Sequence, residues 1–186
     1  MPLITNITSS LDWIGYSEQT SIGRTQDDGL LKPAIAISSG TGLGQANEAW
    51  CASGTITPQA TAIFDFRNLG FSSFGFEFRK VFNTVKVLHI INLGTGTILV
   101  RNSGQADAIT FLGGHNEIGQ EGVLHWYTPL GVAVPSGTNR LYLYNPNLSS
   151  IQYKLGIIGL FGTGAGLGGG AVRNCGFTNG FSAGFC

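Results

Sequence analysis

The feature that most constrains the fold is a series of short β runs between residues 49 and 161, separated by turn residues. Phe74-Gly75-Phe76-Glu77-Phe78 alternates Phe with a small or charged residue, which is the period-2 pattern of a half-buried strand. Val85 to Ile91 is a β-branched run closed by Asn92, and Gly94-Thr95-Gly96 then predicts a tight hairpin. We expect about nine strands, at residues 60–66, 74–78, 85–91, 97–101, 108–112, 123–127, 131–134, 141–144 and 151–161.

No segment with a helical period lies between these runs, so a parallel sheet built from strand-helix-strand units is not expected. The pattern instead predicts an all-β fold, an antiparallel β-sandwich of jelly-roll type over residues 49–161. A chain of 186 residues has the length for one such domain, which can bury roughly 70% of its unfolded surface. Its stability therefore requires neither a disulfide nor a metal ion.

Residues 1–48 are polar and irregular, and we interpret them as an extended N-terminal arm that packs on another surface. Its aromatic anchors are Trp13 and Tyr16. The one piece with helical character runs from Asp12 to Gln19, and it is too short to form a stable helix alone. Trp13 and Tyr16 are therefore candidate partner-binding residues.

Residues 162–186 form a Gly-rich C-terminal arm, in which a linker precedes Phe177, Phe181 and Phe185. Large apolar side chains on an otherwise polar tail are wasteful unless a surface receives them. That surface belongs either to a neighbouring molecule or to the chain's own sandwich. In the first case Phe177, Phe181 and Phe185 are further partner-binding residues.

The composition favours assembly with other protein. Charged residues make up 11% of the chain, less than half of the usual share of about 25%, whereas hydrophobic residues make up 42%. Such a surface is expected to be covered, and self-association as a dimer or trimer is the simplest form of cover. The alternative is a neutral, loop-rich soluble domain.

The charge balance argues against nucleic acid as a partner, because ten basic and ten acidic residues give a net charge of zero. The nearest approach to a basic cluster is Arg79, Lys80 and Lys86. In strands of this pattern we expect these charges to point to solvent while their hydrophobic neighbours point inward.

The chain shows neither a secretory signal nor an apolar stretch of 18 residues, so neither export nor a membrane partner is expected. The three cysteines, Cys51, Cys175 and Cys186, are odd in number and lack the spacing of metal ligands. We therefore expect free thiols and no disulfide.

Each apparent catalytic or cofactor-binding motif lacks other residues that such a site needs. Residues 164–169 match G-x-G-x-x-G, but no acidic residue follows, and a dinucleotide site needs one about 20 positions on. His89, His115 and His125 lack zinc-ligand spacing, and His89 and His125 are expected to have structural roles within strands. We expect no enzyme activity, no cofactor and no metal, although a spatial pair of carboxylates for sugar hydrolysis would leave no sequence pattern.

An ordered series of motifs covers the stretch from about Thr57 to Leu160. The motifs are Val85-Lys86-Val87-Leu88-His89-Ile90-Ile91-Asn92, Phe111-Leu112-Gly113-Gly114, and the segments at 128–134, 137–145 and 153–159. In this order they resemble a group of small tailed-phage virion proteins. The resemblance implies a cement or decoration protein, made in the host cytoplasm and located on the capsid surface of the virion, with the major capsid protein as partner. The arms at both ends have no obvious counterpart in that group.

Two other functions remain open. One is a tail, baseplate or head-fibre receptor-binding protein that recognises host-surface glycan, for which Trp126, Tyr127, Tyr142 and Tyr144 are candidate contacts. Tyr and Trp in alternating strands are, however, more often core or interface residues. The other is a carbohydrate-active or lectin-like soluble module.

Overall fold

The computed structural model describes residues 5–8, 11–19, 23–31, 34–73, 76–101 and 104–161. Strands and the loops between them account for all of these residues, and none of them is helical. Every strand pair within the two large sheets is antiparallel. The all-β, antiparallel architecture predicted from the sequence is therefore confirmed.

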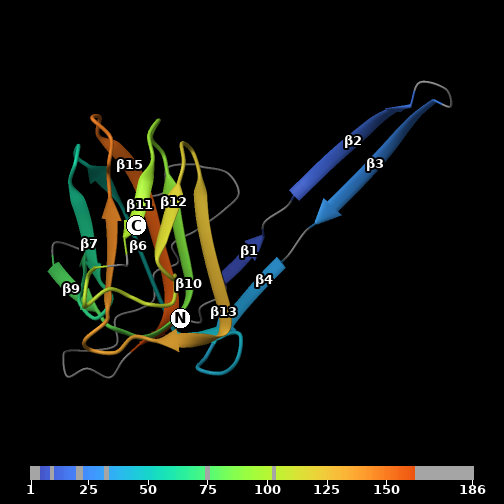
Figure 1. Ribbon diagram of the computed structural model, residues 1–186. Coiled ribbons are helices and arrows are strands. Elements are labelled where there is room, and N and C mark those ends of the chain that lie inside the picture. The colour runs from blue at the N-terminus through green and yellow to red at the C-terminus, as the bar shows by residue number, and fades with distance from the viewer. Residues whose placement is uncertain are drawn as a thin grey trace.

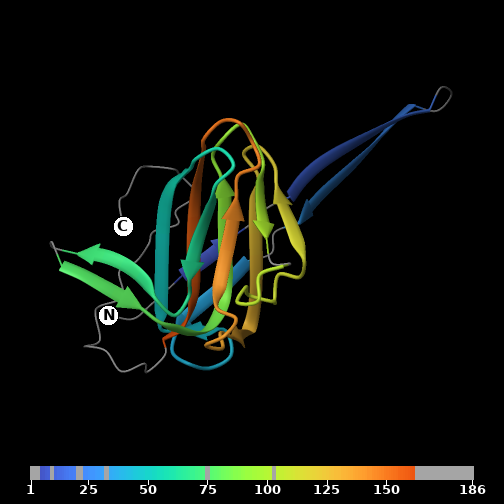
Figure 2. The ribbon, with the colours of Figure 1, turned by 60° about the vertical axis from the view of Figure 1, so that its left-hand side comes forward.

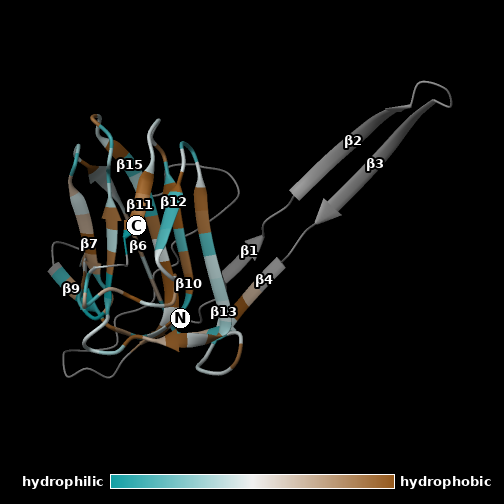
Figure 3. Cartoon of the chain, in the orientation of Figure 1, coloured by the Kyte–Doolittle hydropathy of each residue, from teal (hydrophilic) through white to brown (hydrophobic). Residues whose placement is uncertain are grey.

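Two four-stranded sheets pack face to face and form a β-sandwich (Figure 1). The first sheet has the order β13 (Val123–Ala133), β10 (Phe82–Asn92), β15 (Ile151–Phe161) and β6 (Glu48–Ile56). The second has the order β12 (His115–Ile118), β11 (Ile98–Arg101), β14 (Arg140–Tyr144) and β7 (Thr61–Asp65). Figure 3 shows hydrophobic and hydrophilic residues interleaved along these strands, the pattern of sheets with one buried face.

The core lies between the two sheets. Trp50, Leu88 and Ile157 are cross-strand neighbours in the first sheet and belong to one hydrophobic cluster. Leu141 and Leu143 join that cluster from the second sheet and are fully buried. Because side chains alternate along a strand, the residues between these core positions lie on the outer face of each sheet.

A second, smaller hydrophobic cluster covers part of the outer face of the first sheet. It forms under β4 (Ala34–Ser39) and β5 (Gln45–Ala46), which pair in parallel. Ile37 and Ala46 supply its outer layer. The residues beneath them are Ala49, Val87, Ile158 and the half-buried Tyr127.

A two-stranded ribbon projects from the sandwich (Figures 1 and 2). It consists of β2 (Leu11–Gln19) and β3 (Gly23–Leu31), which pair along their whole length. β1 (Thr5–Thr8) pairs with β4 and joins the ribbon to the sandwich. A separate hairpin of β8 (Leu69–Ser73) and β9 (Phe76–Lys80) is inserted between β7 and β10.

The structure corrects three local predictions. The segment with helical character, Asp12 to Gln19, lies in β2, because pairing with β3 satisfies its backbone in an extended form. Residues 108–112 are not a strand but a turn that follows a single bridge between Ala108 and Arg140. Finally, several strands were not among those expected from the sequence, namely β1, β3, β4, β5, β6, β8 and β12.

Cys51 in β6 is disulfide-bonded, so the expectation of three free thiols is wrong. That expectation rested on an odd cysteine count, which still permits one bond among three cysteines. Cys175 and Cys186 lie outside the described residues, as does the whole predicted C-terminal arm.

Two fully buried asparagines, Asn92 and Asn145, hold the loops at one end of the sandwich. Each follows or closes a core strand, and each side-chain amide lies within hydrogen-bond distance of three backbone carbonyls in neighbouring loops and strand ends, which share its two N–H hydrogens. Each side-chain oxygen also accepts from the backbone two residues on, the geometry of an Asx turn.

Candidate partner-binding surface

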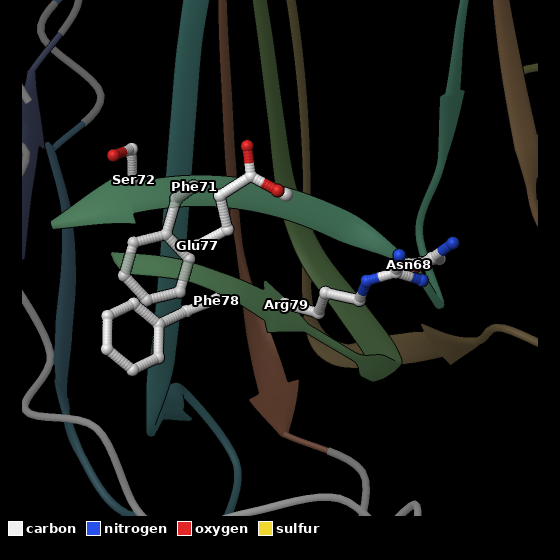
Figure 4. Close-up of a pocket in the computed structure, with 7 residues that line it drawn as sticks. Asn68, Phe71, Ser72, Glu77, Phe78 and Arg79 are labelled. Atoms are coloured by element: carbon white, nitrogen blue, oxygen red, sulfur yellow. The ribbon is translucent and has the colours of Figure 1, made fainter. Parts of the chain in front are cut away.

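The β8–β9 hairpin presents an aromatic pair beside a shallow hollow. Phe71 and Phe78 face each other across the two strands, with ring centroids 5.3 Å apart and ring planes 24° apart. Phe78 is 44% exposed. Figure 4 shows the two rings side by side, with Glu77 and Arg79 on the same hairpin. The hollow has a volume of about 380 Å³, and the Arg79 guanidinium donates to Asn68 Oδ1 at 2.9 Å.

The base of the hairpin is fixed by a buried ion pair. Lys80 Nζ lies 2.5 Å from Glu48 Oε1, and both side chains are about a tenth exposed. Lys80 also donates to the Ala49 carbonyl at 2.6 Å and lies 5.0 Å from the centroid of the Phe71 ring. Trp50 adds a bond from its indole N–H to the Gly70 carbonyl at 3.0 Å. The hairpin is therefore rigidly attached where it leaves the sandwich.

The expected basic cluster does not form. Lys80 is buried against Glu48, and Lys86 is only 1% exposed and donates to the Gly42 carbonyl at 2.5 Å. Burial lowers the pKa of Lys86. The prediction that these charges point to solvent is wrong for both lysines. Inside the fold, the Glu48 carboxylate accepts a hydrogen bond from Lys80, and the Gly42 carbonyl accepts one from Lys86. Arg79 alone of the three is exposed.

Two exposed leucines lie together at the end of the sandwich where β5 begins. Leu43 is 69% exposed and Leu130 is 75% exposed. The loop that contains Leu43 is joined to β13, which contains Leu130, by a hydrogen bond from the Gly44 N–H to the Pro129 carbonyl at 3.1 Å. We call Leu43 and Leu130 the base patch. Paired leucines exposed this far are an unusual use of surface unless another surface covers them.

The structure places only some of the predicted partner-binding residues. Trp13 and Tyr16 lie in β2, at register positions opposite Gly29 and Gln26 of β3. Phe177, Phe181 and Phe185 lie outside the described residues, and their role stays a prediction.

Two of the aromatic residues considered for glycan binding face hydrophobic clusters. Trp126 packs on Phe111, with ring centroids 4.3 Å apart, at the margin of the main core. Tyr127 packs against the second cluster beneath β4 and β5. Neither ring therefore stands open on a shallow groove.

The other two aromatic candidates, Tyr142 and Tyr144, are held by polar neighbours on the second sheet. The Tyr142 hydroxyl donates to Asp107 at 2.7 Å, which raises the pKa of Tyr142, and the side chain is buried. The Arg101 guanidinium lies 3.5 Å from the centroid of the Tyr144 ring. A sugar would have to displace that cation to stack on the ring.

His89 and His125 are paired across β10 and β13, with their Nδ1 atoms 3.1 Å apart. Burial, and then the neighbouring His125, lowers the pKa of His89 to about 4. Burial also lowers the pKa of His125. The predicted structural role of these two side chains within strands agrees with this hydrogen-bonded arrangement. Within the described ranges, no three His, Cys, Asp or Glu side chains come close enough to hold a metal ion.

Sequence reasoning missed the Phe71–Phe78 pair and the base patch. The pair could have been found from two short alternating runs, Leu69-Gly70-Phe71 and Phe76-Glu77-Phe78, which are separated by a few residues that include a glycine. That pattern is a hairpin signal. The base patch has no such signal, because Leu43 and Leu130 are 87 residues apart in the sequence.

No protein-family model matches the chain, and no curated protein is similar to it. In the part of the chain that the structure describes, no helix is long and apolar enough to cross a membrane.

Proposed function

We propose that the chain is a capsid cement protein of a tailed phage, a jelly-roll domain that binds the outer head surface and clamps major capsid protein subunits. The protein acts by contact alone, with the β2–β3 ribbon as its docking arm. The motif series of residues 85–159 supports a virion protein by resemblance. The single observation that carries the docking role is the ribbon itself.

The strand order supports a jelly roll. From β6 the chain passes to β7 in the other sheet, returns to β10, crosses to β11 and β12, and then visits β13, β14 and β15 in alternate sheets. Two interlocked Greek keys of eight strands have this order. Such a sandwich is a rigid block that can carry extended arms.

The ribbon supports the docking role because two paired strands gain little stability from each other alone. Nine cross-strand pairs give it a length of roughly 30 Å at about 3.3 Å per residue. A two-stranded ribbon without a third strand or a packed face is marginally stable at best in water. Among the described residues no third strand pairs with the ribbon, and backbone groups along such free edges can be joined by another strand. A neighbouring shell subunit supplies the missing surface.

The base patch supports a second contact. Leu43 follows β4, the strand that comes after the ribbon in the chain, and Leu130 lies in β13, where the Gly44 N–H bonds to the Pro129 carbonyl. Two contacts carried by one chain bind a shell more strongly than either alone, because the second contact forms at high effective concentration.

The test is co-sedimentation with heads assembled from the major capsid protein of the same phage. Replacing residues 11–31 with a short Gly-Ser turn should abolish co-sedimentation and leave the melting temperature within a few degrees of wild type. Undiminished binding by this variant would refute the ribbon as the docking arm. Binding of neither protein to heads would refute the cement function.

Matched leucine variants test the base patch. Leu43→Ser with Leu130→Ser should weaken head binding by at least tenfold. Leu148→Ser is the control, because Leu148 is 92% exposed in a loop at the opposite end of the sandwich. Equal effects of the two changes would show that the base patch has no specific role.

A further inference from the structure

A pair of histidines bridges an edge strand and a central strand of the first sheet. His89 on β10 and His125 on β13 are direct cross-strand neighbours, and their Nδ1 atoms are 3.1 Å apart. Leu88 and Ile90, on either side of His89 in the chain, belong to the main core, so the two imidazoles lie on the outer face of the sheet. His125 is exposed there, and His89 is half-buried.

Apolar cross-strand pairs flank the two histidines on both sides. Val87 lies opposite Tyr127 in the second hydrophobic cluster, and Ile91 lies opposite Val123 on the other side. Val87 is 1% exposed and Ile91 is 8% exposed. Close-packed neighbours of this kind limit the rotation of the rings, so the two Nδ1 atoms are held near each other.

The separation of the two nitrogens fits the ligands of a single metal ion. Imidazole nitrogens bind Zn²⁺ at about 2.0–2.1 Å, so two of them on one ion lie about 2.9 Å apart at a right angle and about 3.3 Å apart at the tetrahedral angle. The observed 3.1 Å lies between these values. We propose that His89 and His125 chelate a divalent transition-metal ion that prefers imidazole ligands, with Cu²⁺ bound more tightly than Zn²⁺ or Ni²⁺.

Metal binding replaces the hydrogen bond between the two rings. In the metal-free pair one Nδ1 carries a proton and donates a hydrogen bond to the lone pair of the other Nδ1. That proton moves to Nε2 of its own ring by exchange with water, so both Nδ1 lone pairs bind the ion, no proton is released, and nothing is oxidised or reduced. Among the residues that the structure describes, no third His, Cys, Asp or Glu side chain joins the pair, so water completes the coordination.

A metal ion at this place ties an edge strand to its neighbour. Among the described strands, β13 pairs only with β10. His89 and His125 are 36 residues apart in the sequence, so the two ligands come together only in the folded chain. An ion that binds the folded chain more tightly than the unfolded chain stabilises the fold by mass action. This metal site is independent of the proposed function.

Calorimetric titration of untagged full-length protein with copper chloride and zinc chloride is the first test. Free thiols are alkylated beforehand, because thiolates also bind these ions. Wild type should bind one Cu²⁺ ion per chain with micromolar affinity, Zn²⁺ more weakly, and Mg²⁺ not at all. His125→Gln should weaken Cu²⁺ binding at least tenfold. His115→Gln is the matched control, because His115 is exposed in β12 of the other sheet, and it should bind as wild type does.

The electron paramagnetic resonance spectrum of the Cu²⁺ complex identifies the ligands. It should show hyperfine splitting from two nitrogen nuclei in wild type and from one in His125→Gln. Because His125 is exposed, this variant should keep the wild-type melting temperature without metal, and saturating Cu²⁺ should raise the melting temperature by several degrees in wild type only. Equal Cu²⁺ affinity in wild type and His125→Gln, an equal loss in His115→Gln, or a wild-type spectrum with fewer than two nitrogens would overturn the proposal.

Discussion

Replacing Asn145 with Ala should destabilise the sandwich more than any surface change in the same loop. The Asn145 side chain is fully buried, and its amide donates to the carbonyls of Ile56, Thr57 and Ser149 at 3.0, 3.2 and 2.8 Å. Its oxygen accepts from the Asn147 N–H at 2.9 Å. One side chain thus joins the end of β6 to the loop between β14 and β15.

The magnitude follows from the groups left without partners. Alanine removes the donors to three carbonyls, and each buried polar group without a partner costs about 1–3 kcal/mol. Water that enters the vacated space offsets part of this cost. We therefore expect a loss of about 2–4 kcal/mol, which lowers the melting temperature of a domain this size by roughly 5–15 °C.

Thermal and urea unfolding under one fixed redox condition measure the effect. Asn145→Asp should be at least as harmful as Asn145→Ala at neutral pH, because a carboxylate cannot donate and would face three carbonyl oxygens. Leu148→Ala is the matched control in the same loop and should change stability by less than about 0.5 kcal/mol. An Asn145→Ala protein within that same margin of wild type would refute the role assigned to this side chain.

Three further results are expected. Lys80→Ala should lower the free energy of unfolding, measured in urea, by roughly 3–5 kcal/mol, because it leaves the buried Glu48 carboxylate without its cation. Lys80→Met combined with Glu48→Leu should recover much of that loss. No recovery would contradict this explanation. The pKa of His89 is lowered from 6.5 to about 4, so its contribution to stability is present above about pH 6.5 and is lost as the pH falls toward 4. The melting temperature should therefore fall over that range by less in His89→Gln than in wild type, and parallel pH profiles would argue against it. The purified chain should also self-associate as a dimer or trimer, and light scattering that shows only monomer at high micromolar concentration would count against this.

The strands of the sandwich could be predicted where one face is buried. In β10 and β15 the hydrophobic pattern is set by the core, so residues 85–91 and 151–161 were recognisable from the sequence alone. β6 was missed because small and polar residues, Ala49, Ala52, Ser53 and Gly54, interrupt its hydrophobic alternation. The hydrogen bonds to β15 that hold it in the sheet form only in the folded chain. β2 looked helical because nothing in its own sequence reveals the pairing with β3.

The candidate surface was harder to predict because it depends on long-range contacts. Lys80 was expected in solvent, but its counter-charge, Glu48, lies 32 residues earlier in the sequence. The disulfide at Cys51 was missed for a related reason. An odd number of cysteines does not show which of them lie close together in the fold. The spacing of the cysteines in the sequence gives no sign that Cys51 has a bonding partner.

The coupling between ribbon and sandwich decides whether a docked ribbon can hold the whole domain. β4 continues from the ribbon into the second cluster, where Ile37 is 2% exposed and packs with Val87 and Ile158. Val87 and Ile158 are cross-strand neighbours on β10 and β15, the two central strands of the first sheet. Close-packed side chains transmit strain because they have little room to move. A load on the ribbon therefore reaches the two central strands of the first sheet rather than an edge strand, which could separate more easily. The proposed clamping role would require an attachment of this kind.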